Sequence, residues 1–303
     1  MDIHYINNQQ YTLEDFEKII SSGVKVMMGP KAEKAIVDCH DYLSRKLESQ
    51  DQIIYGINTG FGSLCNTVVG HDELEQLQLN LVRSHACGLG SEVPSEMVKR
   101  ILLLKVIGLS KGHSGVQLDT VERILFFYNE EILPIIYEQG SLGASGDLAP
   151  LAHMSLPIIG EGEVMFKGKK RLAKEVLQEL GLSAIRLQAK EGLALLNGTQ
   201  FMSAYLSFGV SRGFDVLNKA NNVASITIDA FQGLLSPFKS NVNELRNQKG
   251  QIDVAKYIFN RLEGSELIAQ NKNHVQDPYS LRCIPQVHGA SLDILRYCQE
   301  VFE

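Results

Sequence analysis

Residues 140–156, GSLGASGDLAPLAHMSL, form the decisive stretch of this 303-residue sequence. Three consecutive small residues, Ala144, Ser145 and Gly146, lie in a turn-forming run that leads into a short apolar helix. Gly146 has no Cβ, so its amide nitrogen can fold back toward the Ala144 carbonyl, a conformation that most side chains would obstruct. Attack on that carbonyl would close a five-membered ring, and loss of water from the ring and from Ser145 would leave an exocyclic methylidene. Such a group is an electrophile that unmodified side chains do not provide.

The ordinary interpretation of the same tripeptide is a Gly-Ser turn before a helix that Asp147 caps. Ala-Ser-Gly occurs by chance in many loops, so only the flanking residues can distinguish a ring-forming tripeptide from an ordinary turn. The whole run GASGDLAPLAHMSL resembles the signature of the aromatic amino acid ammonia-lyases, and within them most closely that of the histidine ammonia-lyases. The resemblance implies that Ala144-Ser145-Gly146 cyclises spontaneously to 4-methylidene-imidazol-5-one (MIO). It also implies that no external cofactor or metal is required.

The composition is that of an ordinary globular protein, with 44% hydrophobic and 21% charged residues, which is enough to bury a large core. A net charge of -6 without a basic cluster argues against nucleic-acid binding. The five cysteines are scattered and without CxxC spacing, which favours a reducing cytoplasm over a disulfide framework or a zinc site. The start lacks a signal-peptide pattern, and the longest apolar stretch, 101–109, contains Lys105 and is too short to span a membrane. We therefore expect catalysis on a small molecule and no membrane partner.

Apolar residues recur at helical spacing along most of the chain, which predicts a mainly α fold. Thr12 favours the start of a helix, and residues 31–48 and 72–87 favour packing helices. Residues 94–138 favour two long helices broken at 111–115. The later sequence GEVMFKGKKRLA predicts one small β-hairpin, the only strand pair that we expect.

Tyr55 stands at the entrance of IIYGINTGFGSL, residues 53–64, where β-branched residues give way to three glycines and a loop is expected. By itself, Tyr55 could be a core aromatic residue with a satisfied hydroxyl. YGINTGFG nevertheless resembles a motif of the ammonia-lyases, whose tyrosine removes the substrate β-proton. A tyrosine with a pKa near 10 needs local positive charge or hydrogen bonds to act as a base at neutral pH.

Two further residues, His85 and Asn197, interrupt helical patterns. His85 lies near the end of the helix predicted over 72–87, where a dipole partner or a core residue is the ordinary interpretation. Asn197 breaks the apolar face of AKEGLALLNGTQ, and it either ties down local backbone or faces a polar ligand. SHA and LALLNGT resemble the histidine ammonia-lyases. The resemblance implies that His85 lies beside the substrate ring and that Asn197 contacts the MIO carbonyl and the substrate.

The last informative stretch is VQDPYSLRCIPQVHG, residues 275–289, in which a turn precedes Tyr279 and Arg282. Arg282 could be a surface charge, yet its planar fork suits a carboxylate held by two hydrogen bonds, which an amino acid substrate provides. QDPYSLRC resembles the histidine ammonia-lyases. The resemblance implies that Tyr279 supports proton transfer or product release and that Gln276 forms a hydrogen bond nearby.

Taken together, five separated motifs in the order of the family imply elimination of ammonia from L-histidine to give trans-urocanate. The resemblance also implies a homotetramer whose active sites draw on several subunits. Residues 1–200 would form the MIO domain, and residues 201–303 would begin a long central helical bundle. Family members continue with further helices that carry active-site residues, including an acidic one, so we expect residues 1–303 to be an N-terminal portion that is inactive alone. Two alternatives stay open, namely a tyrosine ammonia-lyase or aminomutase of the same family, and a non-catalytic helical scaffold.

Overall fold

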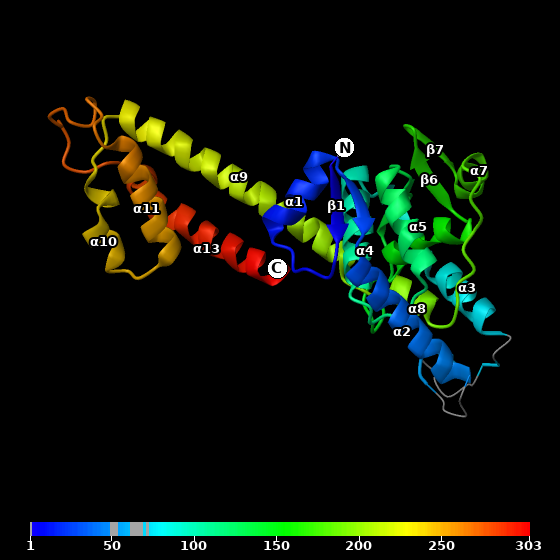
Figure 1. The fold of residues 1–303 in the computed structure, drawn as a ribbon. Coiled ribbons are helices and arrows are strands. Elements are labelled where there is room, and N and C mark those ends of the chain that lie inside the picture. The colour runs from blue at the N-terminus through cyan, green and yellow to red at the C-terminus, as the bar shows by residue number, and fades with distance from the viewer. Residues whose placement is uncertain (1, 49–53, 61–68, 71–72) are drawn as a thin grey trace. The chain divides into compact units, whose positions relative to one another are not determined.

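The structure is a computed structural model that describes residues 2–48, 54–60, 69–70 and 73–303. Helices dominate the chain (Figure 1), which confirms the predicted mainly α fold. The chain divides into two compact units, Met1–Tyr205 (unit 1) and Leu206–Glu303 (unit 2), and the division falls inside helix α9. The boundary that the sequence predicts after residue 200 lies in the first turn of that helix. No helix in the described ranges combines the length and apolar character needed to cross a membrane.

Unit 1 contains ten helices in its described residues, counting the start of α9 and one 3-10 helix: α1 (Leu13–Ser22), α2 (Pro30–Glu48), α3 (Leu74–His85), α4 (Ser95–Ser110), α5 (Leu118–Asn129), α6 (Ala149–Ser155), η3 (Leu156–Ile159), α7 (Ala173–Glu179), α8 (Glu191–Leu196) and α9 (Gln200–Ala230). Its strands are β1 (Ile3–Ile6), β2 (Lys25–Met28), β3 (Leu89–Glu92), β4 (Leu133–Pro134), β5 (Tyr137–Gln139), β6 (Glu163–Phe166) and β7 (Lys169–Leu172). They form a parallel pair β1–β2, an antiparallel pair β3–β5, and a three-stranded antiparallel sheet β4–β6–β7.

Local sequence signals set several of these boundaries. The Thr12 hydroxyl accepts a hydrogen bond from the Asp15 amide at 3.1 Å, and the Asp15 carboxylate accepts one from the Thr12 amide at 3.2 Å. This reciprocal capping box starts α1 where the sequence predicts it. The predicted hairpin is confirmed as β6–β7, with Lys167 and Gly168 at positive φ values of 50° and 72° in its two-residue turn.

Two predictions about secondary structure are wrong, one for a helix and one for the number of strand pairs. Residues 130–138 do not continue a helix, because α5 ends at Asn129 and Glu131 adopts a φ of 53° that breaks the helical path. Pro134 then lies in β4, where its missing N–H does no harm at the end of a two-residue pairing. The β6–β7 hairpin is also not the only strand pair, because strands of two to four residues are too short for their alternation to stand out in the sequence.

The centre of unit 1 is the pair of helices α4 and α5, which pack against each other and bury Ile101, Leu102 and Ile124 completely. Full burial of one such side chain contributes roughly 1.5–3 kcal/mol to stability. Beside it, α3, α6 and α8 pack against one another in all three combinations. Every residue of α6 is buried. These three helices form what we call the site scaffold.

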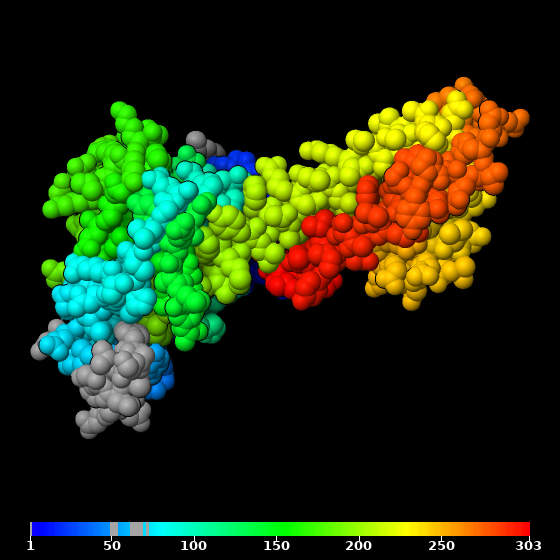
Figure 2. Space-filling model, turned by 180° about the vertical axis from the view of Figure 1, so that it is seen from behind, coloured from blue at the N-terminus to red at the C-terminus, as the bar shows by residue number. Residues whose placement is uncertain are grey.

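Unit 2 is built from the remainder of α9, η4 (Ser236–Phe238), α10 (Ser240–Glu244), α11 (Lys249–Leu262), α12 (Tyr279–Arg282) and α13 (Ile284–Phe302). Ile228, Val254 and Ile258 form the centre of its core. Helices α11 and α13 approach closely where two glycines meet, since a Cβ on Gly250 would lie only 2.1 Å from the carbonyl oxygen of Gly289. Helix α13 lies along the part of α9 that belongs to this unit (Figure 2).

Large apolar side chains of α9 and α13 remain outside this core. Seven of them are between 61% and 69% exposed: Val216, Val223, Ile226, Val287, Ile294, Tyr297 and Val301. A shallow groove of about 780 Å³ also runs between the two helices. Apolar surface on this scale marks a surface that binds other protein.

Candidate active site

The tripeptide Ala144-Ser145-Gly146 forms the exposed tip of a tight turn. The Gly146 amide donates to the Gly143 carbonyl at 3.0 Å, and the Gly143 amide donates to the Gly146 carbonyl at 3.3 Å. The φ of Gly146 is 80°, which favours glycine, and a Cβ built there would meet no atom within 4 Å. The Gly146 amide therefore folds back on the chain, where it contacts the carbonyl of the residue before Ala144.

Asp147 fixes the base of this turn. Its Oδ1 accepts hydrogen bonds from the Ser141 amide at 2.8 Å and from the Ala149 amide at 3.1 Å. Gly140 permits this arrangement, because a Cβ at that position would lie 2.0 Å from Oδ2 of Asp147. Asp147 thus joins the strand side of the turn to the first residue of α6, but it is not the helix cap of the ordinary interpretation, because the N-cap position belongs to Leu148.

The site scaffold connects the turn to two other predicted residues. Helix α6 follows the turn directly, α3 ends at His85, and α8 ends just before Asn197. The three predicted groups therefore lie at the ends of three helices that pack against one another. His153 of α6 strengthens the connection, since its Nε2 accepts a hydrogen bond from the Gly88 amide at 2.9 Å. Burial lowers the pKa of His153, which keeps the ring neutral and able to accept.

The half-buried imidazole of His85 is held by its own helix. Its Nδ1 lies 2.9 Å from the Leu81 carbonyl. A carbonyl can only accept, so Nδ1 carries the proton of this hydrogen bond and Nε2 is the nitrogen left for a ligand. The prediction of a histidine at a helix C-terminus is confirmed. Its contact with the helix end orients the ring.

Asn197 is half-buried and ties down local backbone, which is one of its two predicted roles. Its backbone amide donates to the Leu193 carbonyl at 3.1 Å, and its Nδ2 donates to the same carbonyl at 3.3 Å. Within the described part of the chain, Oδ1 of Asn197 has no hydrogen-bond partner. The hydrogen bond of Nδ2 thus orients the side chain, and Oδ1 can accept a hydrogen bond from a ligand.

Tyr55 is 59% exposed, which excludes the interpretation as a core aromatic residue. It lies in a turn that the Asn58 side chain closes by accepting from the Ile54 amide at 2.7 Å. Gly56 follows at a φ of 72°. The rest of the glycine-rich motif, residues 61–64, lies outside the described residues.

The remaining predicted residues lie together in unit 2. Gln276 is exposed, Tyr279 begins α12 and is 69% exposed, and the Arg282 guanidinium lies 4.5 Å from the centroid of the Tyr279 ring. The buried carboxylate of Asp277 anchors the segment by accepting from the Leu234 amide at 2.7 Å and contacting His274 Nε2 at 2.7 Å. Arg282 is half-buried and stacked, so it is not an ordinary surface charge. That these residues share a site with those of unit 1 stays a prediction.

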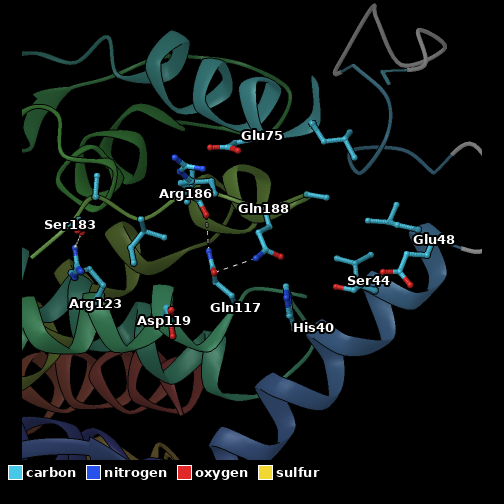
Figure 3. Close-up of a pocket in the computed structure, with 17 residues that line it drawn as sticks. His40, Ser44, Glu48, Glu75, Gln117, Asp119, Arg123, Ser183, Arg186 and Gln188 are labelled. Atoms are coloured by element: carbon cyan, nitrogen blue, oxygen red, sulfur yellow. Dashed lines mark hydrogen bonds between the residues drawn. The ribbon is translucent and has the colours of Figure 1, made fainter. Parts of the chain in front are cut away.

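A pocket of about 850 Å³ in unit 1 contains none of the predicted site residues. It lies between α2, the starts of α3 and α5, and residues 183–189 (Figure 3). Its polar groups are largely used by local backbone: Arg123 donates to the Ser183 carbonyl at 2.8 Å, and Gln117 donates to the Arg186 carbonyl at 2.9 Å. We therefore do not place the chemistry there.

Sequence reasoning missed four buried polar residues that support the site scaffold: Gln78, Lys105, His153 and Glu191. Two of them carried a visible signal. Lys105 interrupts the most apolar stretch of the sequence, and Glu191 stands immediately before the apolar run of α8. A charge inside an apolar segment indicates a specific buried partner.

Comparison with known proteins identifies the family of the chain. The family model described as aromatic amino acid lyase matches residues 11–303. The chain is 43% identical over 297 residues to the histidine ammonia-lyase of Caldanaerobacter subterraneus subsp. tengcongensis. The matched region covers 98% of this chain and 58% of that protein. The crystal structure of histidine ammonia-lyase from Trypanosoma cruzi matches with a TM-score of 0.86 and 34% identity, over 99% of this chain and 56% of that one. Tyrosine aminomutase from Streptomyces globisporus matches with a TM-score of 0.91 and 32% identity, over 99% and 60%. The chain belongs to the aromatic amino acid lyase family.

Proposed function

We propose that this chain supplies the electrophile-forming part of a histidine ammonia-lyase, which eliminates ammonia from L-histidine to give trans-urocanate. One observation carries the proposal: the Ala144-Ser145-Gly146 turn leads into α6, which packs against α3 and α8, the helices that end at His85 and just before Asn197. The histidine ammonia-lyases of Caldanaerobacter and Trypanosoma cruzi support the choice of substrate.

The turn fits the MIO group. Residues 144–146 would themselves become the group, Gly146 has a positive φ that folds its amide back on the chain, and Asp147 holds the base of the turn. Once formed, MIO supplies an electrophilic carbon that makes the substrate amino group a better leaving group. The exposed turn of the chain alone lacks packing that would press Gly146 onto Ala144, so we infer that residues 1–303 by themselves retain an unmodified tripeptide.

The side chains around the turn have distinct proposed roles. Tyr55 takes the β-proton of the substrate, and His85 offers Nε2 to the imidazole. Asn197 uses its amide to orient MIO and substrate. In unit 2, Arg282 binds the substrate carboxylate. Tyr279 supports proton transfer or product release, with Gln276 as a hydrogen-bond partner nearby.

We infer that other protein completes the site. Tyr55 and the turn are exposed, and the apolar faces of α9 and α13 described above are open. A homotetramer in which further helices cover these faces would both bury the apolar surface and enclose the substrate. The described cysteines, Cys39, Cys87, Cys283 and Cys298, are free, which supports a reducing cytoplasm as the location.

The runner-up is a tyrosine ammonia-lyase or aminomutase, which the similarity to the Streptomyces globisporus structure favours. A histidine at the position of His85 is compatible with both substrates, because imidazole can bond to a phenol as well as to another imidazole. Substrate preference therefore has to be measured.

The test uses residues 1–303 alone and residues 1–303 combined with the part of the Caldanaerobacter relative that lies beyond the matched region, which we call the completed enzyme. Each preparation is assayed with histidine, tyrosine and phenylalanine. We expect no turnover by residues 1–303 alone, and in the completed enzyme a kcat/KM for histidine at least about tenfold above that for the other two. A preference for tyrosine would establish the runner-up, and a folded, assembled preparation that is inactive on all three would indicate a scaffold.

A further inference from the structure

Helix α8 is too short to be stable by itself. It contains six residues, whereas isolated helices below about 12 residues are marginal in water. Asn197, the residue to which we assign a role in orienting MIO and substrate, follows its last residue directly. The position of Asn197 therefore depends on what holds α8 at its two ends.

The start of α8 is held by a buried carboxylate and a buried amide. Glu191 accepts hydrogen bonds from the amides of Gln188 at 2.7 Å and Gln117 at 3.1 Å, and from Nε2 of Gln117 at 2.7 Å. The Gly192 amide donates to Oε1 of Gln78 at 2.9 Å. A side chain at position 192 would collide with Gln78, whose backbone oxygen would lie 2.9 Å from the new Cβ. This end is therefore held to α3 by Gln78 and to the residue before α5, Gln117, by Glu191.

The other end of α8 is held by Lys105, which reaches it from α4. Only 2% of this residue is exposed, and its Nζ donates to the Ala194 carbonyl at 2.7 Å and to the Asn197 carbonyl at 3.2 Å. These carbonyls lie at a helix C-terminus, where backbone oxygens lack intrahelical partners and carry partial negative charge. No carboxylate pairs with Lys105 in the part of the chain that the structure describes.

A buried lysine without a carboxylate is costly, because burial disfavours its charged form. Burial lowers the pKa of Lys105 to about 7. A methionine or leucine would fill the same space in α4 without that cost. The two carbonyls that Lys105 contacts are therefore the feature that accounts for a lysine at this position.

We propose that Lys105 is a positioning residue, which fixes the C-terminal end of α8 and thereby the orientation of the Asn197 side chain. The inference rests on the function proposed above for Asn197. Lys105 itself touches neither the turn nor a substrate. Its effect on the reaction passes through the backbone of residues 194–197.

The test compares Lys105→Met, which keeps the volume and removes the donors, with Lys105→Arg, which keeps the donors. Lys99→Met is the matched control, because Lys99 lies on the same helix but pairs with Glu131 at 2.8 Å and is 22% exposed. Hydrogen exchange of the 191–199 segment is measured on residues 1–303, and kcat and KM for histidine are measured on the completed enzyme. The exchange measurement needs no activity, so it stands even if the proposed function fails.

We expect Lys105→Met to speed exchange of the 191–199 amides by about tenfold or more, because it removes both hydrogen bonds to the C-terminal end of α8. In the completed enzyme, kcat should fall by about tenfold while KM changes less than about twofold, and Lys105→Arg should recover most of both losses. Lys99→Met should change neither. If Lys105→Met fails to fold, Lys105→Gln, which is shorter and uncharged, replaces it under the same criteria. Unchanged exchange, or unchanged kcat with faster exchange, would overturn the proposal.

Discussion

The turn at residues 143–146 and helix α6, its near neighbour in sequence, differ sharply in burial. The turn is exposed at every position, whereas α6 is buried along its whole length. Asp147 connects the two through its hydrogen bonds to Ser141 and Ala149. An exposed group held by a buried helix is oriented without being enclosed, which suits a site that other protein completes. Substitutions in the turn should therefore alter chemistry, and substitutions in the helix should alter stability.

The largest expected effect comes from Ser145→Ala in the completed enzyme. No methylidene can form at position 145 without a side-chain leaving group, so lyase activity should be lost while the unfolding midpoint stays unchanged. The matched control is Leu151→Ala in α6, which should lower the free energy of unfolding by about 2–5 kcal/mol because Leu151 is buried. Near wild-type turnover by Ser145→Ala would remove the basis for the proposed chemistry.

Tyr55→Phe should lower kcat by about a hundredfold or more and leave KM nearly unchanged. The hydroxyl acts as a base in the transition state, and its side chain is too exposed for the change to disturb a core. Steady-state kinetics of the completed enzyme measure this directly. A rise in KM with kcat unchanged would instead make Tyr55 a binding residue.

His85→Leu should lower kcat/KM for histidine by about tenfold and make tyrosine and phenylalanine relatively better substrates. The substitution removes the hydrogen bond offered by Nε2 and exposes apolar surface to the ring. The ratio of kcat/KM values for the three amino acids is the measurement. If the ratios stay unchanged, the selectivity lies in residues outside this chain or in unit 2.

The smallest expected effect is the pH dependence that Lys105 gives to the free energy of unfolding. The pKa of Lys105 is about 7 in the folded chain because of burial, against an ordinary value of 10.5. Between these values the unfolded chain binds a proton that the folded chain does not, so the free energy of unfolding rises with pH, by at most about 1.4 kcal/mol per pH unit. Urea unfolding at several pH values from 7 to 9.5 should show this rise in the wild-type chain relative to Lys105→Met. If the free energy of unfolding of the wild-type chain, relative to that of Lys105→Met, stays constant or falls as the pH rises, the prediction is contradicted.

The sequence predicts the features that depend on neighbouring residues. The helix start at Thr12 and the β-hairpin in GEVMFKGKKRLA follow from local chemistry, and both are confirmed. Residues 130–138 could not be predicted in the same way, because an apolar run of this kind suits a buried strand as well as a helix. Pairing of Leu133 with Met165 decides the outcome, and the two residues are too far apart in the sequence for a local pattern to show their contact.

In the candidate site, too, the sequence predicts local motifs and misses contacts between remote residues. Motif residues such as Ser145 and Asn197 were named from resemblance, and the structure adds how each is held. The holding residues were missed because their partners are remote: Lys105 and Ala194 are 89 positions apart, and Gln78 and Gly192 are 114 apart. No local pattern records such a contact.

The central claim is that an ordinary exposed turn becomes the reactive group of the enzyme. The most direct test is the mass of the proteolytic peptide that contains Ser145, isolated from completed enzyme that turns over histidine. We predict a mass lower than that of the unmodified peptide by two water molecules, and an unmodified mass for the same peptide from residues 1–303 alone. An unmodified Ala144-Ser145-Gly146 peptide from an active preparation would contradict the account.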